Sequence, residues 1–461
     1  MKDEKLYFDV DKYKVTNKSG STLFTSEMHF RWFKTSFTGK DILLKLDGNK
    51  TIDQVINEIS DEYELPIDVI EKDIIKFCKT ALEKELIFKS KEDILEAKVN
   101  NNIRSIYLDI TNACNLKCKY CNKAVCNESE GKFLVPEVLK KYLDKINEKN
   151  NGASILVNVT GGEPLLHKDI EKIFELIKSY DYKIGLLTNG MLIDEKNAEV
   201  IEKYCDYVML PLDSVDKKIN DEIRGKGAYN GVVRAMAICQ KYKIPFFIST
   251  TPTKYSIDNM EKLMSFCYES AAEGIIANEP ILVKEDGTDI SSEFDYSQDK
   301  LRSKYSYMQK RSTIINSWKN SRLKYGKEKK VNLVFIEDTK RCMNNIFNIV
   351  NKESCGAGIN EILINIDGDV YPCHALHLKE YNLGAIEEYM DKKKALIKVK
   401  EINECNNCVY NIFCLGGCRA EALYRNKSIN AKYPECDYSK NIYEQTLDTP
   451  LRPAEMKAKI E

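Results

Sequence analysis

Short apolar runs alternate with amphipathic stretches through the central part of the chain. Runs rich in β-branched and aromatic residues predict strands at residues 105–110, 155–160, 183–188, 207–212, 245–250 and 274–277. Apolar residues at helical spacing between these runs predict helices, among them 136–149, 168–180, 198–204 and 232–242. Repeated strand–helix units predict an α/β fold whose parallel strands form a full or partial barrel, the partial form being a TIM-like (β/α)6 barrel over residues 105–283.

The first ninety residues predict a separate small domain. Short β-prone pieces at 6–10 and 13–16 precede a helix that begins at a capping box formed by Thr51 and Gln54. A second helix is predicted over 67–82, with apolar residues on one face. This pattern is typical of a winged-helix-type domain at 1–90, and the charged stretch 91–104 predicts a linker.

Two regions of different character follow the barrel. Residues 284–340 are polar and Lys-rich and are predicted to form a helical bridge. Residues 341–440 predict short turns around clustered cysteines, and residues 441–461 a C-terminal tail. The clustering of cysteines indicates that this second region binds metal.

Composition and charge narrow the classes of function. The chain has 70 Lys and Arg against 71 Asp and Glu, so no excess of charge indicates a nucleic-acid or membrane partner. No apolar run is long enough for a transmembrane helix, and the N-terminal residues lack the apolar core of a signal peptide. We therefore expect a cytoplasmic protein whose sixteen cysteines are metal ligands or core thiols rather than disulfides.

Three cysteines directly follow the first predicted barrel strand. Cys114, Cys118 and Cys121 have the spacing C-x3-C-x2-C, which places three thiolates on one short loop at the carboxyl end of a strand. A structural zinc takes four protein ligands, whereas three leave a position open for a substrate or cofactor. The spacing therefore favours a reactive metal centre over the alternatives, a structural zinc or a buried thiol cluster.

The second barrel strand ends in a glycine-rich turn, Thr160-Gly161-Gly162-Glu163-Pro164. Its glycines allow a ligand to approach the backbone, and Glu163 offers a carboxylate to a cation such as an ammonium group. By itself the motif is weak evidence and is better explained as a tight turn between strand and helix. Its position one strand after the three cysteines indicates that both belong to one site.

These motifs together resemble the radical S-adenosylmethionine (SAM) superfamily, whose members share C-x3-C-x-aromatic-C, with Tyr120 as the aromatic residue here. The resemblance implies a four-iron four-sulfur cluster on the three cysteines, with SAM bound at the fourth iron. It also implies contacts to SAM from Tyr120 near the adenine, Gly161, Gly162 and Glu163 at the amino group, and Arg224, which follows Leu212-Asp213-Ser214, at the carboxylate. Pro211 stands where relatives often carry a serine.

Seven further cysteines lie in the last quarter of the chain, with spacings that resemble the SPASM domain, which carries two auxiliary four-iron four-sulfur clusters. The resemblance implies one cluster on Cys405, Cys408, Cys414 and Cys436, and a second on Cys355, Cys373 and Cys418. The second set is one ligand short, so that either Cys342 completes it or an iron stays open to a substrate thiolate. A pair of zinc knuckles is the alternative. His374, next to Cys373, is a candidate acid, base or hydrogen-bond donor.

Residues 1–90 resemble the leader-recognition domain of ribosomal peptide maturases, chiefly at Leu46-Asp47-Gly48-x-Lys50-Thr51-Ile52. The resemblance implies that a leader peptide adds a strand to an exposed β edge. A DNA-binding winged helix is the alternative, but no basic recognition helix is evident.

The joint pattern, including Cys355-Gly-Ala-Gly and Asn382-Leu-Gly-Ala385, is most similar to sactipeptide-type thioether-forming maturases (sactisynthases). This resemblance implies an oxidoreductase that takes a hydrogen from Cα of a precursor peptide and installs Cys thioether crosslinks. It would use three [4Fe-4S] clusters, SAM and a flavodoxin- or ferredoxin-type reductant. The alternatives are a peptide epimerase with Cys126 as hydrogen donor, a carbon–carbon crosslinking maturase, and a non-enzymatic iron–sulfur electron carrier.

Overall fold

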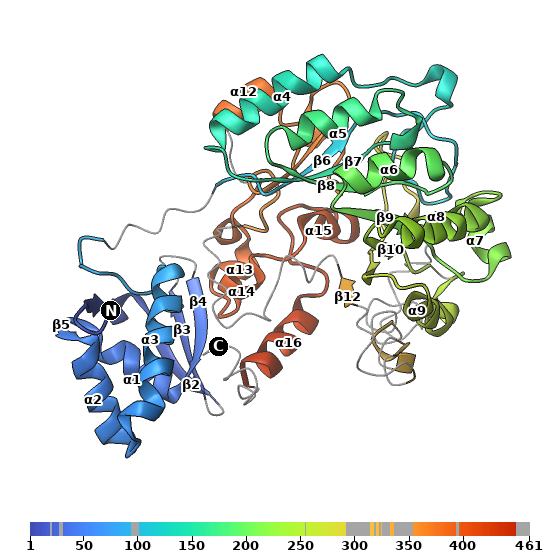
Figure 1. The fold of residues 1–461 in the computed structure, drawn as a ribbon. Coiled ribbons are helices and arrows are strands. Elements are labelled where there is room, and N and C mark those ends of the chain that lie inside the picture. Colours follow the sequence, from blue (N-terminus) through green and yellow to red (C-terminus); the bar gives the residue numbers. More distant parts are fainter. Residues whose placement is uncertain are drawn as a thin grey trace.

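The computed structural model describes residues 1–18, 21–26, 31–93, 101–253, 255–291, 314–317, 320–321, 324, 332–335, 354–392 and 396–448. Figure 1 shows an N-terminal domain, a central barrel and a C-terminal region that lies between them. None of the helices in these residues combines the length and the apolar character that crossing a membrane requires.

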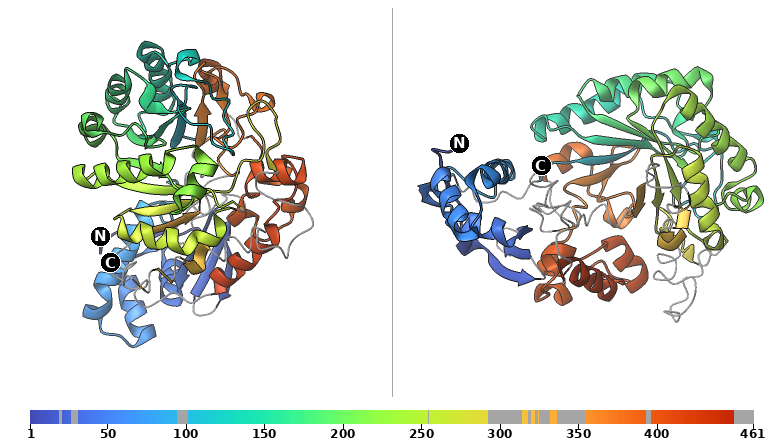
Figure 2. Two further views of the ribbon diagram at one scale, coloured as in Figure 1. Left: turned by 90° about the vertical axis from the view of Figure 1, so that its right-hand side faces the viewer. Right: turned by 60° about the horizontal axis from the view of Figure 1, so that its bottom comes forward.

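The six predicted barrel strands form within one residue of their expected bounds. They are β6 (Ser105–Asp109), β7 (Leu156–Thr160), β8 (Lys183–Leu187), β9 (Tyr207–Pro211), β10 (Phe246–Thr250) and β11 (Gly274–Ala277). All pair in parallel and in sequence order. The helices between and after them lie on the outside of the curved sheet (Figure 2), and they are α4 (Pro136–Lys149), α5 (Ile170–Lys178), α6 (Glu195–Tyr204), α7 (Lys217–Arg224), α8 (Ala228–Tyr242) and α9 (Met260–Glu269).

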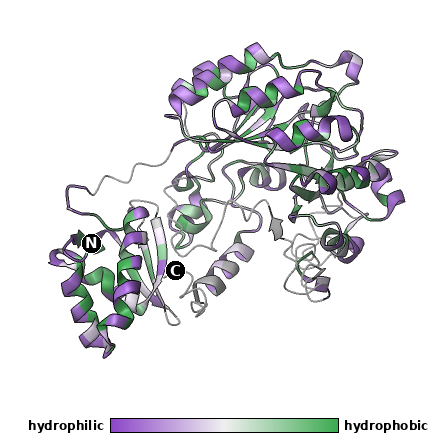
Figure 3. Cartoon of the chain, in the orientation of Figure 1, coloured by the Kyte–Doolittle hydropathy of each residue, from purple (hydrophilic) through white to green (hydrophobic). Residues whose placement is uncertain are grey.

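Residue alternation explains which side of each strand faces the helices. In β6, Ile106 and Leu108 belong to the main core, and Val157 and Val159 of β7 do the same. The neighbouring positions point to the inside of the barrel. Figure 3 shows the matching pattern on the helices, with hydrophobic residues toward the strands and hydrophilic residues outward.

The barrel sheet extends beyond the predicted strands at both edges. β12 (Asn332–Phe335) pairs in parallel with β11, and β13 (Glu361–Ile364) pairs in parallel with β6 and antiparallel with β14 (Val370–Tyr371). The described strands form an open sheet, as expected of a partial barrel. The prediction of a helical bridge over 284–340 is wrong at 332–335, because these residues cover the otherwise open edge of β11.

The N-terminal domain combines two antiparallel sheets with three helices. Its strands are β1 (Lys5–Tyr7), β2 (Lys14–Lys18), β3 (Ser21–Ser26), β4 (Arg31–Ser36) and β5 (Asp47–Thr51), and its helices are α1 (Phe37–Lys45), α2 (Ile52–Tyr63) and α3 (Ile67–Glu83). The two sheets are β1-β5 and β2-β3-β4. The predicted capping box is confirmed, because Thr51 and Gln54 exchange hydrogen bonds at the start of α2. The first predicted β piece ends early, since Val10–Lys12 forms a 3-10 turn.

The C-terminal region packs against both other parts. Helix α12 (Ile386–Lys392) joins the main core beside α4, while α13 (Asn403–Asn406), α14 (Asn411–Cys414) and α15 (Arg419–Asn426) form short turns around the cysteines. Helix α16 (Cys436–Asp448) runs into the predicted tail, so the chain stays helical to residue 448.

Candidate active site

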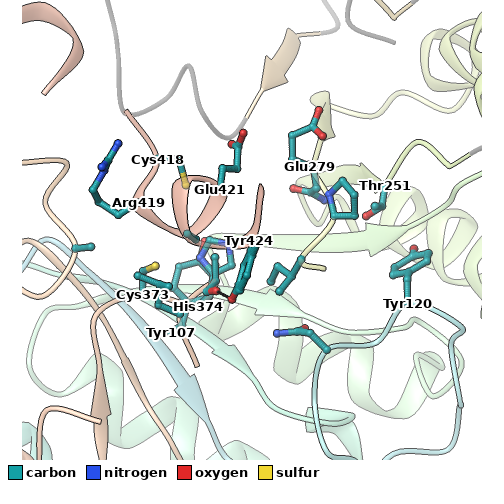
Figure 4. Close-up of a pocket in the computed structure, with 18 of the residues that line it drawn as sticks. Tyr107, Tyr120, Thr251, Glu279, Cys373, His374, Cys418, Arg419, Glu421 and Tyr424 are labelled. Carbon is teal, nitrogen blue, oxygen red and sulfur yellow. Dashed lines mark hydrogen bonds between the residues drawn. The ribbon is translucent and has the colours of Figure 1, made fainter. Parts of the chain in front are cut away.

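A cavity of about 370 Å³ lies where the carboxyl ends of the barrel strands meet the C-terminal region (Figure 4). Cys118 and Cys121 line it from the barrel, and Cys355, Cys373, Cys414 and Cys418 line it from the C-terminal region. Figure 4 shows Tyr120 toward one end of the cavity and Cys373 and Cys418 toward the other. Two cysteine sets that lie far apart in the sequence therefore face one cavity.

The loop after β6 holds its cysteines through backbone contacts. The Cys114 amide donates to the Cys126 carbonyl at 2.9 Å, and the Cys118 thiol donates to the Arg224 carbonyl at 3.4 Å. Cys114, Cys118 and Cys121 are free of disulfides, and burial raises the pKa of each, to about 11 for Cys114 and Cys118. A cation is therefore needed to keep them as thiolates, and three soft donors on one loop fit an iron–sulfur cluster.

The glycine turn after β7 lies directly against this loop. The Gly162 amide donates to the Thr111 carbonyl and the Glu163 amide donates to the Ala113 carbonyl, both at 2.7 Å. A Cβ on Gly161 would lie 2.2 Å from the Thr111 oxygen, and one on Gly162 would lie 2.0 Å from the Ala113 oxygen. The glycines are required for this close approach of two backbones.

The Glu163 side chain points into the protein. It is fully buried and accepts hydrogen bonds from the Thr188 hydroxyl at 2.6 Å, the Asn189 amide at 2.7 Å and the Leu165 amide at 3.1 Å. Burial raises the pKa of Glu163, and these donors oppose that rise. Its carboxylate thus fastens the glycine turn to the end of β8, which leaves the backbone carbonyls of the turn as the groups that can face an ammonium ligand.

Asp213 joins Arg224 and Tyr120 into one buried network. Arg224 Nε lies 2.8 Å from Asp213 Oδ2, and the Tyr120 hydroxyl donates to the same oxygen at 2.6 Å. The Arg224 guanidinium lies 5.3 Å from the centre of the Tyr120 ring. Burial lowers the pKa of Arg224. The charge and hydrogen bond of Asp213, together with the nearby Tyr120 and Cys118, outweigh burial and raise this pKa. Arg224 and Tyr120 also line the cavity, so Asp213 orients both toward a bound ligand.

Replacing Asp213 by alanine is expected to destabilise the protein by about 3–5 kcal/mol, because Arg224 would remain buried without its carboxylate. Urea unfolding in matched preparations would measure this. Glu195→Ala is the matched control, since its ion pair with Lys241 is solvent-exposed and contributes little to stability. Equal losses in the two variants would contradict the role given to Asp213.

The cysteines of the C-terminal region fall into two groups. Cys405 lies close to Cys408, Cys414 and Cys436. Burial, together with the charges of these cysteines, raises the pKa of Cys405 to about 11. We call these four the outer cysteine set. Cys355, Cys373 and Cys418, the other predicted cluster ligands of this region, all line the cavity, and we call them the inner cysteine set. Cys414 of the outer set also reaches the cavity wall. Cys342, the predicted fourth ligand of the inner set, lies outside the described residues.

Several residues that line the cavity carry no signal in the sequence. Tyr107 and Ser249 lie at alternate strand positions that point inside the barrel, and the Tyr107 ring lies 4.5 Å from that of His374. Strand alternation could have identified them only once the core side of each strand was known. Ser249 pairs with Pro211 across β9 and β10, so a hydroxyl does occur beside the position where relatives often carry a serine.

A polar cluster lies on the other side of the cysteine loop. The Lys123 ammonium donates to both Asp109 oxygens at 2.6 and 2.5 Å, and the Ala124 amide donates to Glu285 at 3.0 Å. Glu285 also lies 2.5 Å from His377 Nδ1. Although Asp109, Glu285 and His377 are close enough to hold a metal ion, Lys123 already supplies the positive charge there. The cluster ties the cysteine loop to the C-terminal region.

The remaining cysteines do not face the cavity. Cys78, Cys205, Cys239 and Cys267 are buried in the cores, which confirms their prediction as core thiols. Cys126 pairs with the loop backbone, and its thiol donates to the Asn112 carbonyl at 3.6 Å. It is not among the residues that line the cavity.

Comparison with known proteins adds independent information on two parts of the chain. Residues 108–267 match the model of the Radical SAM superfamily, and residues 30–87 match that of coenzyme PQQ synthesis protein D (PqqD). The chain is 23% identical over 437 residues to the antilisterial bacteriocin subtilosin biosynthesis protein AlbA of Bacillus subtilis, which covers 89% of each chain. It is 26% identical over 383 residues to an uncharacterized protein of Archaeoglobus fulgidus, covering 80% of this chain and 88% of that protein.

Solved structures share the fold at low sequence identity. The structure of Streptococcus suis SuiB bound to S-adenosylmethionine has a TM-score of 0.55 at 18% identity, covering 93% of this chain and 99% of SuiB. Native anSMEcpe with bound AdoMet has a TM-score of 0.59 at 22% identity, covering 77% of this chain and 98% of that chain.

Proposed function

We propose that this chain, whose residues 108–267 form a radical SAM domain and whose N-terminal part contains a PqqD domain, matures a ribosomally made precursor peptide by installing Cys thioether crosslinks. The observation that carries the proposal is the single cavity that connects the loop of Cys118 and Cys121 to the inner cysteine set. The similarity to AlbA, named for subtilosin biosynthesis, and to SuiB, solved with its precursor peptide SuiA, supports a peptide substrate.

A radical SAM domain implies SAM and a [4Fe-4S] cluster, and the free thiols of Cys114, Cys118 and Cys121 fit that cluster. When bound, the cluster supplies the electron that splits SAM into methionine and a 5'-deoxyadenosyl radical. Arg224 would bind the carboxylate of SAM, Tyr120 would lie against its adenine, and the backbone of Gly161 to Glu163 would accept hydrogen bonds from its amino group.

The outer and inner cysteine sets would hold two further [4Fe-4S] clusters. The inner set lies in the cavity, where an iron with only three cysteine ligands would be open to the thiolate of the peptide. We further propose that the protein acts in the cytoplasm, with a flavodoxin- or ferredoxin-type protein as the source of electrons.

The cavity walls would confine the peptide while it reacts. Leu187, Met209 and Leu376 make much of its surface apolar, which excludes water that would otherwise compete for the radical. One Cα–H and one S–H bond of the peptide are broken and one C–S bond forms. The hydrogen atom would join the 5'-deoxyadenosyl radical to give 5'-deoxyadenosine, and the thiol proton would go to solvent. The inner cysteine set would hold the cluster that supplies an acceptor for the remaining electron.

Incubation of the reconstituted protein with SAM, a reductant and a Cys-containing precursor peptide tests this function. We expect the peptide to lose the mass of one hydrogen molecule per crosslink and to become resistant to thiol alkylation at each crosslinked cysteine. An unchanged peptide mass would instead indicate the epimerase. Cys126, the predicted hydrogen donor of an epimerase, is poorly placed for that role because it does not line the cavity. The same mass loss with a reactive thiol would indicate carbon–carbon crosslinking, and absence of 5'-deoxyadenosine would leave only the electron carrier.

A further inference from the structure

The three-stranded sheet β2-β3-β4 of the N-terminal domain has two buried faces. Phe24 and Phe33, a directly paired couple in β3 and β4, belong to the core of the N-terminal domain itself. Leu23 and Trp32 point to the opposite side, because side chains alternate along a strand. Leu23 is 6% exposed and Trp32 is 4% exposed, so this second face is covered by another part of the chain.

That cover comes from the segments that carry the outer cysteine set. Leu23 and Trp32 form one hydrophobic cluster with Val399, Ile412, Phe413 and Tyr443, and the rings of Trp32 and Phe413 lie 4.9 Å apart. Cys405 and Cys414 pack against the same cluster. Figure 2 shows the sheet beside these C-terminal helices. We call the four C-terminal residues of this cluster the platform.

The platform depends on the outer cysteines for its shape. Phe413 directly precedes Cys414 on the four-residue helix α14, and Tyr443 lies on α16, which begins at Cys436. A helix of four residues is far too short to form without outside support. In small loop-rich regions a bound metal supplies that support, because its ligands are brought together only when the metal holds them.

We propose that the outer cysteine set, with its metal bound, holds the platform in shape and thereby fixes the N-terminal domain against the rest of the protein. The metal of this set would then act on peptide capture by setting where the N-terminal domain is held. The link to peptide capture rests on the proposed function, whereas the docking itself does not.

The docking is tested by small-angle X-ray scattering and hydrogen exchange on the full chain with and without reconstituted clusters. We expect the iron-free protein and the Cys436→Ala variant to show a larger radius of gyration and faster exchange in β3 and β4. Trp32→Ala should show the same changes with its full iron content. Val69→Ala, at an N-terminal side chain that is 57% exposed and outside the platform, is the matched control and should change neither.

Two results would overturn the proposal. One is iron-free protein whose scattering and exchange match those of the loaded protein, since the platform would then form without metal. The other is a Trp32→Ala variant that remains as compact and as protected as the wild type. Slow hydrogen exchange in β6 to β8 would verify that the Cys436→Ala variant has kept its barrel. If Cys436→Ala fails to fold, Trp32→Ala still tests the proposal, because it leaves all cysteines in place.

An activity readout separates this proposal from the proposed function. Trp32→Ala should form 5'-deoxyadenosine in the absence of peptide at the wild-type rate. At low peptide concentration its modification of a leader-bearing peptide should fall by about tenfold or more, because the captured peptide is no longer held near the cavity. A leaderless peptide should be modified equally by both proteins. Failure of the wild type to cleave SAM would refute the proposed function but leave the scattering result intact.

Discussion

Replacement of Cys118 by alanine is expected to reduce formation of 5'-deoxyadenosine from SAM to background and to remove the iron of one cluster. Cys114, Cys118 and Cys121 supply three donors, and with one of them gone too few remain to hold a cluster. The backbone of the loop is held by contacts such as that between Cys114 and Cys126, so the loop itself should survive the change. Iron analysis and product chromatography measure the two effects.

Cys126→Ala is the matched control for this variant. Cys126 lies on the same loop, but its thiol contacts only the Asn112 carbonyl among the hydrogen bonds described, and it does not line the cavity. It should keep both its iron content and SAM cleavage. Retention of SAM cleavage by Cys118→Ala, or its loss in Cys126→Ala, would show that the cluster is held by a different set of thiols.

The cysteine loop and the six central strands could be predicted because their signals are local. The thiols of Cys114, Cys118 and Cys121 lie within a few residues on one loop, and buried parallel strands appear as short apolar runs between helices. The edge strands β12 and β13 were not predicted, because the contacts that define them are not local in the sequence. Each has four residues, and β13 becomes a barrel strand only by pairing with β6, more than 250 residues earlier in the chain. No local sequence pattern indicates so distant a strand partner.

The same distinction separates the predicted from the unpredicted parts of the site. The types of residue at Glu163 and Arg224 indicated charge recognition, but not which partner each side chain has. Glu163 is occupied by donors from the end of β8, and Arg224 by Asp213 from the end of β9. These partners meet only because the carboxyl ends of neighbouring parallel strands converge, which requires the strand order to be known.

Convergence of the strand ends also makes the glycine turn and the cysteine loop one mechanical unit. The turn donates its amides at 162 and 163 to carbonyls that lie three residues or fewer before Cys114. Any displacement of the turn must therefore displace the loop that carries the cluster. The buried carboxylate of Glu163 links the glycine turn and the cysteine loop to the end of β8, because it accepts hydrogen bonds from Thr188 and Asn189.

Gly162→Ala is accordingly expected to lower SAM cleavage by about 100-fold or more, because a displacement of roughly 1 Å at a reacting centre is enough for such a loss. A Cβ at this position would lie 2.0 Å from the Ala113 oxygen and 2.6 Å from its carbonyl carbon, and backbone atoms cannot rotate aside as a side chain can. Initial rates of 5'-deoxyadenosine formation, with iron content measured in parallel, would test this.

Gly152→Ala separates this clash from the general cost of losing a glycine. Gly152 has a φ of +67°, which strains an alanine, but no atom lies within 4 Å of the Cβ it would carry. This control should lose about 1 kcal/mol of stability while keeping its rate of SAM cleavage. If Gly162→Ala cleaves SAM as fast as Gly152→Ala, the turn does not position the cysteine loop. If it loses activity but keeps its iron, the turn acts on the bound SAM rather than on assembly of the cluster.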